Sequence, residues 1–557
     1  MAGLVVGIVA LPLAIAFAIA ASPGGDAEHT IGPGIGIITA IVAGLIISLF
    51  GGSRVQIGGP TGAFIIIIYG VVAKFGLSGL LVATILAGVM LVLMGVFRLG
   101  SVIKFIPYPI VVGFTSGIAL TIFTTQVKDL LGLTLEGGAP AAFIDKWMCY
   151  FRNITTLQWD AIIVSAVSIA IIVACTRWMK RLPGSLIAII VTTATVYFTN
   201  QSGLTHVATI GDRFGNITAS LPHINAFHLD WNSLFTDAQG HFTFNTLSAL
   251  FPSAFVIAIL GAIESLLSAT VADGVTGDHH DSNQELIGQG IANIVTPFFG
   301  GIPATGAIAR TMTNINNGAR TCIAGVVHAL VLLVIFIVAM PLAAYIPMPT
   351  LAGVLVVVSY NMSQWRTFAQ LTHRPKSDVV VLLVTFVLTV VFDLTIAIEL
   401  GLVLACLLFM RRMAEVTQLS IFTKEIDPNA DPLADIPLHE EALAIPEGVE
   451  VYEINGPFFF GVANRFEEMT AEMQDHPAIR IIRMRRVPFI DSTGVHNLEN
   501  LCLMSQRDGT QIILSGVQPK VRAVLERAGF PALIGESNIC SHITLALERA
   551  AVLRHKS

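Results

Sequence analysis

The chain has 557 residues, of which 54% are hydrophobic and 12% are charged. This composition is too apolar for a soluble multidomain protein and predicts a protein of the lipid bilayer. The formal net charge of -6 gives no indication of a nucleic-acid partner. The six cysteines are isolated and lack the paired spacing of a disulfide or zinc framework, so we interpret them as packing residues.

The distribution of charged residues divides the chain into a part suited to lipid and a part suited to water. Long stretches before Arg412 contain no Lys or Arg, whereas the C-terminal part has the composition of an ordinary soluble domain. We therefore predict a transmembrane domain at 1–414, a linker at 415–437 and a soluble domain at 438–557.

The first 21 residues form an apolar run without the charged n-region of a secretory signal. A run of about 20 apolar residues is long enough to span the hydrocarbon of a bilayer, so we predict a first transmembrane helix here. Because the run begins so abruptly, a shortened native N-terminal tail is also considered.

Apolar segments continue along the chain and predict fourteen transmembrane segments. They lie near 1–21, 34–52, 60–73, 77–97, 107–131, 160–176, 184–200, 247–271, 285–299, 304–317, 321–341, 348–362, 378–392 and 394–410. The third and the tenth are short for a crossing and follow Gly and Pro, which is typical of half-spans.

Lys and Arg are unevenly distributed between the loops of the two sides. If Met1 faces the cytoplasm, the inner loops collect most of them. The outer side keeps only Lys74, Lys128, Lys146, Arg152 and Arg213. The positive-inside rule therefore places both termini in the cytoplasm of a multi-pass protein of the plasma (bacterial inner) membrane. The loop at 201–246 is then outside, and it contains a glycosylation sequon at 216–218.

Two stretches repeat one pattern: LFGGSRVQIGGPTGAF at 49–64 and FFGGIPATGAIAR at 298–310. Each ends an apolar helix at Phe-Gly-Gly and then passes through a Pro to a Thr-Gly-Ala that opens a short helix. Seven segments precede Gly203 and seven follow Phe244. Because seven is odd, the two halves cross the membrane in opposite senses, and we predict an inverted repeat.

Broken backbone at membrane depth is tolerated only inside protein or beside a wet cavity, because each unpaired polar group in hydrocarbon costs several kcal/mol. The free N–H groups of a helix start, at the positive end of its dipole, bind anions. Two starts from inverted halves can face one another near the midplane, so we predict an anion site there. Its small residues and hydroxyl donors are Thr61, Gly62, Ala63, Thr305, Gly306 and Ala307. The alternative is that Gly and Pro only permit close helix packing.

Glu264 stands alone in the middle of the apolar segment 247–271. Ionisable groups inside spans are costly and usually functional, so this carboxylate could bind a proton, or help to hold Na⁺, and couple transport to an ion gradient. Burial disfavours the charged form, which favours a proton, and Ser265 and Ser268 could hydrogen-bond to it. A structural glutamate satisfied by backbone donors is the alternative. Arg310, one turn inside the tenth segment, either adds positive potential for the anion or pairs with a buried acid.

The stretch DGVTGDHHDSNQE at 273–285 contains two histidines and several acids. Adjacent His side chains diverge, and the i, i+4 arrangement of helical zinc pairs is absent, so we predict no metal site. Capping of the next helix by Asp281 or Ser282 is the preferred interpretation. No resident cofactor is expected, with H⁺ as the coupling ion and Na⁺ as the alternative.

After Arg412 the pattern changes to that of a soluble α/β domain. We predict strands at 449–461, 479–491 and 510–517, and helices at 462–474, 492–509 and 519–530. The Gly-rich fingerprint of a dinucleotide site is absent, so this domain reads as a regulatory module rather than an enzyme.

With these stretches the chain resembles the SulP, or sulfate permease, family of anion transporters, relatives of the animal solute-carrier anion exchangers. The resemblance rests on GGSRVQIGGPTGAF, on TSGIALTIFTTQVKDLLG, on the long stretch from LGAIESLLSATVADG to FFGGIPATGAIAR, and on FIDSTGVHNL in a C-terminal part that is similar to a STAS domain.

The resemblance implies an α-helical polytopic membrane protein with 14 transmembrane segments in a 7+7 inverted repeat, divided into core and gate domains, plus a C-terminal cytosolic α/β STAS domain. It implies an elevator movement of the core, and it marks Phe17, Thr61, Gly62, Ala63, Ala307 and Ile308 as substrate contacts. Glu264 falls where sodium-coupled bicarbonate members carry Asp, which favours a proton here.

Two positions qualify the resemblance. Leu13 replaces the glutamine that many relatives carry after the proline of the first helix, which leaves the identity of the substrate open. Ser492 matches the phosphorylatable serine of anti-sigma-factor antagonists, and a helix N-cap is its alternative role.

We therefore expect no enzyme but a secondary transporter, a proton-coupled symporter of sulfate, bicarbonate or a C4-dicarboxylate. The alternatives are an uncoupled anion exchanger or channel and a Na⁺-coupled bicarbonate symporter. The expected site comprises Phe17, Thr61, Gly62, Ala63, Thr305, Gly306, Ala307 and Ile308 for the substrate, Glu264 and Ser268 for the coupling ion, and Arg310 for electrostatics. The expected partners are the small anion, the lipid bilayer, a second copy in a homodimer and a cytosolic partner of the STAS domain.

Overall fold

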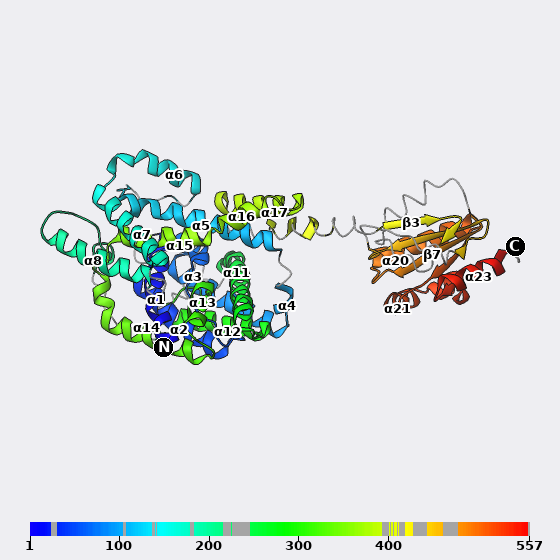
Figure 1. Ribbon diagram of the computed structural model, residues 1–557, viewed down its shortest axis with the longest axis horizontal. Helices are drawn as coiled ribbons and strands as arrows, with labels where there is room; N and C mark the ends of the chain where they lie inside the picture. The colour runs from blue at the N-terminus through cyan, green and yellow to red at the C-terminus, as the bar shows by residue number, and fades with distance from the viewer. Residues whose placement is uncertain are drawn as a thin grey trace. The chain divides into compact units, whose positions relative to one another are not determined.

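The protein is described by a computed structural model over residues 1–23, 30–103, 107–135, 140, 142–178, 183–215, 224, 245–392, 400–401, 403–404, 406–408, 410, 418–426, 443–459 and 477–554. The chain forms two compact units, Met1–Ala405 and Cys406–Ser557. We call the first the membrane unit and the second the C-terminal unit (Figure 1).

The membrane unit is built from helices in both halves of its sequence. The first half contains α1 (Ala2–Ala20), α2 (Pro33–Phe50), α3 (Ile65–Val96), α4 (Gly100–Ile103), α5 (Tyr108–Leu131), α6 (Phe143–Arg152), α7 (Trp159–Trp178), α8 (Gly184–Gln201) and α9 (Ile210–Phe214). The second half contains α11 (Asn245–Thr276), α12 (Ser282–Val295), α13 (Ile308–Asn316), α14 (Ile323–Ala343), α15 (Met348–Met362), α16 (Trp365–Leu371) and α17 (Lys376–Val391).

Within the described residues, seven stretches of helix are long and apolar enough to cross a membrane. They are Ala2–Ala20, Pro33–Phe50, Gly62–Val96, Tyr108–Leu131, Trp159–Trp178, Thr246–Thr276 and Ile323–Ala343. The stretch Gly62–Val96 includes two of the fourteen predicted segments, and the predicted segment at 394–410 lies largely outside the described residues. The number fourteen therefore stays a prediction.

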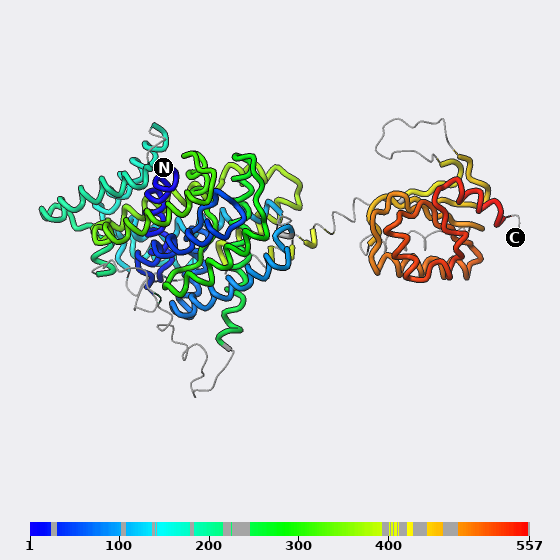
Figure 2. Tube along the Cα trace, turned by 90° about the horizontal axis from the view of Figure 1, so that it is seen from below, coloured from blue at the N-terminus to red at the C-terminus, as the bar shows by residue number. Residues whose placement is uncertain are grey.

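The helices of the membrane unit form two packing groups. In the first, which we call the core group, α3 packs on α11 and α12, α14 packs on α1 and α2, and α13 packs on α1 and α11. In the second, the gate group, α5 packs on α15 and α17, and α7 packs on α8 and α15. Figure 2 shows the blue N-terminal helices lying among green helices from the second half, so the two halves interleave.

Matching contacts recur in the two halves. Gly88 and Gly95, in the second part of α3, lie against the backbone of α12, while Gly325 of α14 lies against Ser48 of α2. In the same way α1 packs on α14, and α11 packs on α3. The contact of α3 with α12 thus matches that of α14 with α2, and the contact of α1 with α14 matches that of α11 with α3. Such matching pairs are what the predicted inverted repeat requires.

A single glycine divides the long helix α3. Gly76 has φ 67° and ψ -175°, a backbone conformation outside the helical region that residues with a Cβ rarely adopt. The helix therefore turns at Gly76, between the predicted third segment at 60–73 and the fourth at 77–97. The predicted boundary and the observed kink coincide within a few residues.

The short helices α4, α6, α9 and α16 were not among the predicted segments. They are too short to span a bilayer, and a search for long apolar runs does not detect them. One of them matters below: α6 lies at the end of the membrane unit opposite the N-terminus (Figure 1).

The C-terminal unit contains a five-stranded sheet in the order β3-β6-β7-β8-β9. Its strands are β3 (Gln418–Phe422), β6 (Val449–Asn455), β7 (Ile479–Arg486), β8 (Gln511–Ser515) and β9 (Ile539–Cys540), and a separate pair joins β4 (Glu425–Ile426) to β5 (Leu443–Ala444). The edge strand β3 runs antiparallel to β6, and the other pairings are parallel.

Helices cover both faces of this sheet. The helices α20 (Ser492–Arg507), α21 (Pro519–Arg527) and α22 (Phe530–Ile534) bury one face, and α23 (Ile543–Arg554) buries the other. Three predicted strands and two predicted helices are confirmed as β6, β7, β8, α20 and α21. The predicted helix at 462–474 lies outside the described residues.

Two details of the C-terminal unit differ from the sequence prediction. The strand β3 falls within the predicted linker at 415–437 and pairs with β6 as part of the sheet. The N-cap of α20 is Asp491, whose carboxylate accepts a hydrogen bond from the Gly494 N–H at 2.7 Å, so Ser492 is the first helical residue and not the cap.

The kink in α3 gives a stability test. We expect Gly76→Ala to destabilise the protein by about 1–3 kcal/mol, because a Cβ is strained in this backbone conformation. The control is Gly70→Ala in the same helix, where no atom lies within 4 Å of an added Cβ. There the lower backbone entropy of Ala should stabilise by about 0.5–1 kcal/mol. Thermal unfolding of both variants in detergent measures the difference, and equal melting temperatures would contradict the strain.

Candidate functional site

The two broken segments pair with each other through their backbones. The strand β1 (Gly58–Gly59) runs antiparallel to β2 (Thr305–Gly306), with Gly58 opposite Gly306 and Gly59 opposite Thr305. Next to this pair the Ala307 N–H donates to the Ile57 carbonyl at 2.9 Å. Part of the polar backbone that the breaks free is therefore satisfied by the other half of the repeat.

Glycine is required at this crossing by close approach. Gly59 has φ 151°, and an added Cβ there would run into the Arg310 guanidinium. A Cβ on Gly58 would overlap the Ile47 side chain, and one on Gly306 would overlap the Gln56 amide. The strand pair can form only because these three positions lack side chains.

A helix start follows each strand. Thr61 is the N-cap of the 3-10 turn η2 (Gly62–Phe64) that leads into α3, and Ala307 is the N-cap of α13. Both starts have extended backbone at the cap, so their first N–H groups point along the helix axis without an intrahelical partner. The structure thus brings the Thr61–Ala63 and Thr305–Ile308 stretches to one place.

Gly62 lies where the core group meets the gate group. A Cβ at this position would lie 3.4 Å from Phe17 of α1, 3.3 Å from Ile122 of α5 and 2.9 Å from the sulfur of Met362 of α15. Phe17 belongs to the core group, whereas Ile122 and Met362 belong to the gate group. The first helix start is consequently covered by apolar side chains of both groups.

The two helix starts differ in exposure. Phe17, Thr61, Gly62 and Ala63 are buried, whereas Ile308 is 40% exposed and Ala307 is half-buried. The start of α13 therefore opens onto accessible surface, and the start of α3 is closed.

The two threonines predicted as hydroxyl donors are used differently. Thr305 is fully buried and donates its hydroxyl to the Gly261 carbonyl of α11 at 2.8 Å, so it holds β2 on α11. The Thr61 hydroxyl is buried and has no hydrogen-bond partner of standard geometry. It faces the Glu264 carboxylate.

Glu264 is half-buried on α11 and adjoins the start of the third segment through Thr61. The two serines considered as its partners are bonded elsewhere. Ser265 donates to Glu285 at 2.8 Å, and Ser268 donates to Thr311 at 3.2 Å. Their place on α11 turns them toward α12 and α13, so the structure brings Thr61, and neither serine, to Glu264.

Arg310 is 2% exposed and donates through Nη2 to the Pro60 carbonyl. No carboxylate within the described residues lies within ion-pair distance of its guanidinium, and Nη1 lacks a hydrogen-bond partner there. Of the two roles considered for Arg310, pairing with a buried acid is not seen among the described residues. The cation lies beside β1, directly behind the start of the third segment.

The sequence analysis missed Glu285, a fully buried carboxylate in the first turn of α12. Its Oε1 accepts from Gln56 at 2.9 Å, Ser265 at 2.8 Å and Gln289 at 3.0 Å. Its Oε2 accepts from the N–H groups of Gly52 at 2.9 Å and Ser53 at 3.1 Å.

The helix that bears Glu285 begins at Asp281, which accepts from Asn283 and Gln284 and thereby confirms one of the two predicted caps. Five donors from three segments converge on Glu285, which identifies it as the structural glutamate of this region. Two features of the sequence could have indicated this cluster. Gln56 lies two residues before Gly58-Gly59, and Glu285 lies four residues after the cap Asp281.

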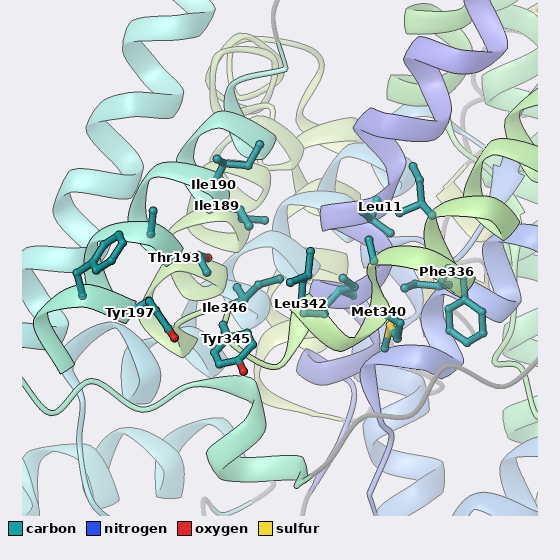
Figure 3. A pocket seen from close by; sticks show the side chains of 17 residues that line it. Leu11, Ile189, Ile190, Thr193, Tyr197, Phe336, Met340, Leu342, Tyr345 and Ile346 are labelled. Atoms are coloured by element: carbon teal, nitrogen blue, oxygen red, sulfur yellow. The ribbon is translucent and has the colours of Figure 1, made fainter. Parts of the chain in front are cut away.

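A prominent cavity elsewhere is unsuited to an anion. It has a volume of about 550 Å³ and lies between α1, α8 and α14 (Figure 3). Its wall consists of aliphatic and aromatic side chains such as Ile189, Phe336 and Met340, with Thr193, Tyr197 and Tyr345 as the hydroxyl-bearing members. With no charged side chain in its wall, it fits hydrocarbon rather than a solute with a charge.

Comparison with known proteins decides the family. Residues 1–385 match the model of the Sulfate permease family, and residues 442–548 match the STAS domain. The chain belongs to the sulfate permease family. It is 39% identical to the "Putative sulfate transporter YvdB" of Bacillus subtilis, over 97% of this chain and 95% of that protein. It is 29% identical to the bicarbonate transporter BicA of Picosynechococcus sp., over 94% of this chain and 89% of that protein.

Solved structures agree on the fold. The murine Slc26a9 anion transporter in the inward-facing state matches with a TM-score of 0.84 at 18% identity, over 99% of this chain and 90% of that one. The transmembrane domain of a cyanobacterial BicA matches with a TM-score of 0.58 at 26% identity, over 73% of this chain and 96% of that one. The protein is thus a helical membrane transporter with a C-terminal STAS domain and not an enzyme, as the sequence predicted.

The Glu285 cluster gives a second stability test. Each hydrogen bond to a charged group contributes about 1.5–3 kcal/mol, and an amide would turn an NH₂ toward donors. We therefore expect Glu285→Gln to destabilise the protein by about 3 kcal/mol or more. The control is Glu264→Gln, which removes no comparable set of donors and should hardly change the melting temperature. Similar melting temperatures for the two variants would contradict the structural role of Glu285.

Proposed function

We propose that the protein imports a small oxyanion or carboxylate, either sulfate, bicarbonate or a C4-dicarboxylate, in symport with protons. The observation that carries the proposal is the meeting of two helix starts at the paired strands β1 and β2, with Glu264 facing the first of them. The names of its relatives YvdB and BicA, which refer to sulfate and to bicarbonate, support an inorganic anion as substrate.

The anion is held mainly by backbone N–H groups. The starts of η2 and α13 offer donors at Gly62, Ala63 and Ile308, and Phe17 of α1 lies next to Gly62. Arg310 adds positive potential from behind β1, where its free Nη1 is not neutralised by an acid of the described residues. Backbone donors select for negative charge, and the apolar cover limits the size of the anion.

Glu264 is the proposed proton acceptor. It is the acidic side chain next to the Thr61 hydroxyl, which belongs to the proposed anion-binding start of the third segment. A negative carboxylate there repels an incoming anion, and a protonated one does not. Anion and proton therefore bind together, which is the requirement for symport.

The core group carries the site in an elevator movement against the gate group. Side-chain hydrogen bonds join helices within each group. In the core group Thr305 donates to the Gly261 carbonyl, and in the gate group Thr350 donates to Thr192 at 2.8 Å. At Gly62 the two groups meet through apolar side chains that can slide without breaking hydrogen bonds. A homodimer and a cytosolic partner of the STAS domain remain part of the proposal.

Uptake into proteoliposomes tests the substrate and the coupling. We expect one of radiolabelled sulfate, bicarbonate, succinate or fumarate to accumulate when the outside is made acidic, and not when Na⁺ alone is supplied. Accumulation that requires Na⁺ would indicate the sodium-coupled alternative. A reversal potential set by the anion alone, with no effect of a pH gradient, would indicate an uncoupled exchanger or channel.

The variant Glu264→Gln separates coupling from binding. An uncharged amide cannot take up the proton, so we expect pH-driven accumulation to be lost while exchange of anion against anion continues. Both activities are measured in the same vesicles, with Asp278→Asn, an exposed carboxylate beyond the end of α11, as the control for an acid outside the site. Unchanged pH dependence in Glu264→Gln would refute the assignment.

A side chain at Gly62 tests the position of the anion. We expect Gly62→Val to reduce uptake at least about tenfold, since the branched side chain occupies the space over the donors and presses on Met362 and Ile122. Gly70→Ala, two turns further along the same helix, should transport normally. Wild-type KM and kcat in Gly62→Val would place the anion elsewhere.

A further inference from the structure

Another cavity, with charged side chains in its wall, lies at the end of the membrane unit that bears α6. It has a volume of about 80 Å³ and lies between α1 and α3 of the core group and α5 and α15 of the gate group. The amphipathic helix α6 reaches into it with Lys146 and Tyr150. None of the site residues considered above lines this cavity.

Lys146 is an unusually buried cation. Its side chain is 4% exposed, and its Nζ lies 5.0 Å from the centre of the Tyr69 ring. No carboxylate of the described residues lies within ion-pair distance of this Nζ. A ring face compensates a buried ammonium only in part. Burial accordingly lowers the pKa of Lys146 to about 8, and the ammonium form that dominates at neutral pH lacks a counterion of its own.

The other charged groups of the cavity leave it positive. Lys128 and Arg213 line it together with Asp129, and the Asp129 carboxylate lies 3.5 Å from the Arg213 guanidinium. Among the described residues of the wall, with Lys146 included, three cations face one acid, and that acid is already paired. The phenols of Tyr69 and Tyr150 complete the titratable groups of the wall.

The cavity has neighbours on two sides. A wider recess of about 330 Å³ adjoins it, because Lys128, Asp129 and Arg213 line both spaces. Ala16 and Ala20 of α1 also line the cavity, and they flank Phe17 within one helical turn. The cavity therefore adjoins both the recess and the stretch of α1 that bears Phe17.

We propose that this cavity is a second anion-binding site, in which Lys146 binds a small oxyanion of the size of carbonate or sulfate on its way to the site at Gly62. The proposal rests on the proposed function, since it takes the transported anion as the ligand. A cavity of 80 Å³ holds a compact oxyanion, and an extended C4-dicarboxylate would have to reach back into the recess. The anion supplies the counterion that the chain does not provide.

Binding is tested without transport. The full-length protein in lipid nanodiscs is treated with acetic anhydride at pH 7.5, with sulfate from zero to 50 mM at constant ionic strength, and acetylation of each lysine is followed by mass spectrometry. We expect sulfate to slow the acetylation of Lys146 at least about fivefold, because a bound anion favours the unreactive ammonium form. Exposed Lys74 is the internal reference and should react at a constant rate. An equal rate for Lys146 at all sulfate concentrations would overturn the site.

The same protection should disappear as the pH rises. Lys146 is protonated below about 8 and neutral above it, so sulfate affinity should fall as the pH passes from 7 to 9. The other titratable groups that line the cavity within the described residues are Lys128, Asp129, Arg213, Tyr69 and Tyr150. Protection that is independent of pH would assign the anion to Arg213 or Lys128 and remove Lys146 from the site.

Variants connect the cavity to transport. We expect Lys146→Met to raise the KM for the anion about tenfold on the α6 face, with kcat within twofold and the KM on the opposite face unchanged. Lys146→Arg keeps the charge and should restore the wild-type KM, and Lys74→Met is the control for loss of an exposed cation. If Lys146→Met lowers kcat and the melting temperature with the same KM, Lys146 is a packing residue on Tyr69 and the proposal fails.

The two proposals can fail separately. Sulfate protection of Lys146 in a protein that accumulates none of the tested anions would support the cavity and refute the transport proposal. Proton-driven accumulation with no protection and no change of KM in Lys146→Met would support transport and refute the cavity.

Discussion

The whole membrane unit depends on the pairing of β1 with β2. Two helices are interrupted near one place, and each interruption frees backbone groups that hydrocarbon cannot satisfy. The cross-repeat bonds, such as that from the Ala307 N–H to the Ile57 carbonyl at 2.9 Å, supply the missing partners. Because these bonds run between the two halves, the site needs both halves of the chain.

Two glutamates, the half-buried Glu264 and the fully buried Glu285, show how much of the site the sequence predicts. Glu264 is visible because it stands alone in an apolar segment, while Glu285 looks like an ordinary residue after a helix cap. The structure gives them opposite surroundings: five donors converge on Glu285, and Glu264 adjoins a threonine whose hydroxyl has no other partner. Partners that are more than 200 residues apart in the chain, such as Gln56 and Glu285, leave no local pattern to read.

Most of the fold follows from local patterns, and the exceptions have physical causes. The segment boundaries, the kink at Gly76 and the Asp281 cap follow from apolar runs, glycine and capping chemistry. The helix α6 and the use of the Thr305 and Ser268 hydroxyls do not, because they depend on which elements become neighbours. Arg310 could be placed on its helix but not paired, since its partner is a carbonyl of the other half.

The arrangement of charge along the core and gate boundary connects the two proposed sites. Tyr69 of α3 contacts Lys146, and Gly62 lies in the turn η2 that leads into the same helix of the core group. Lys128, Ile122 and Met362 belong to the gate group. A displacement of the core relative to the gate therefore changes both sites at once. In the proposed elevator movement, the apolar cover at Gly62 would open while Tyr69 separates from the gate wall, which would alter the solvation of Lys146. An anion at the proposed Lys146 site would then bind to one arrangement of the groups more tightly than to the other, and such a difference in affinity is what allows a ligand to bias a conformational equilibrium.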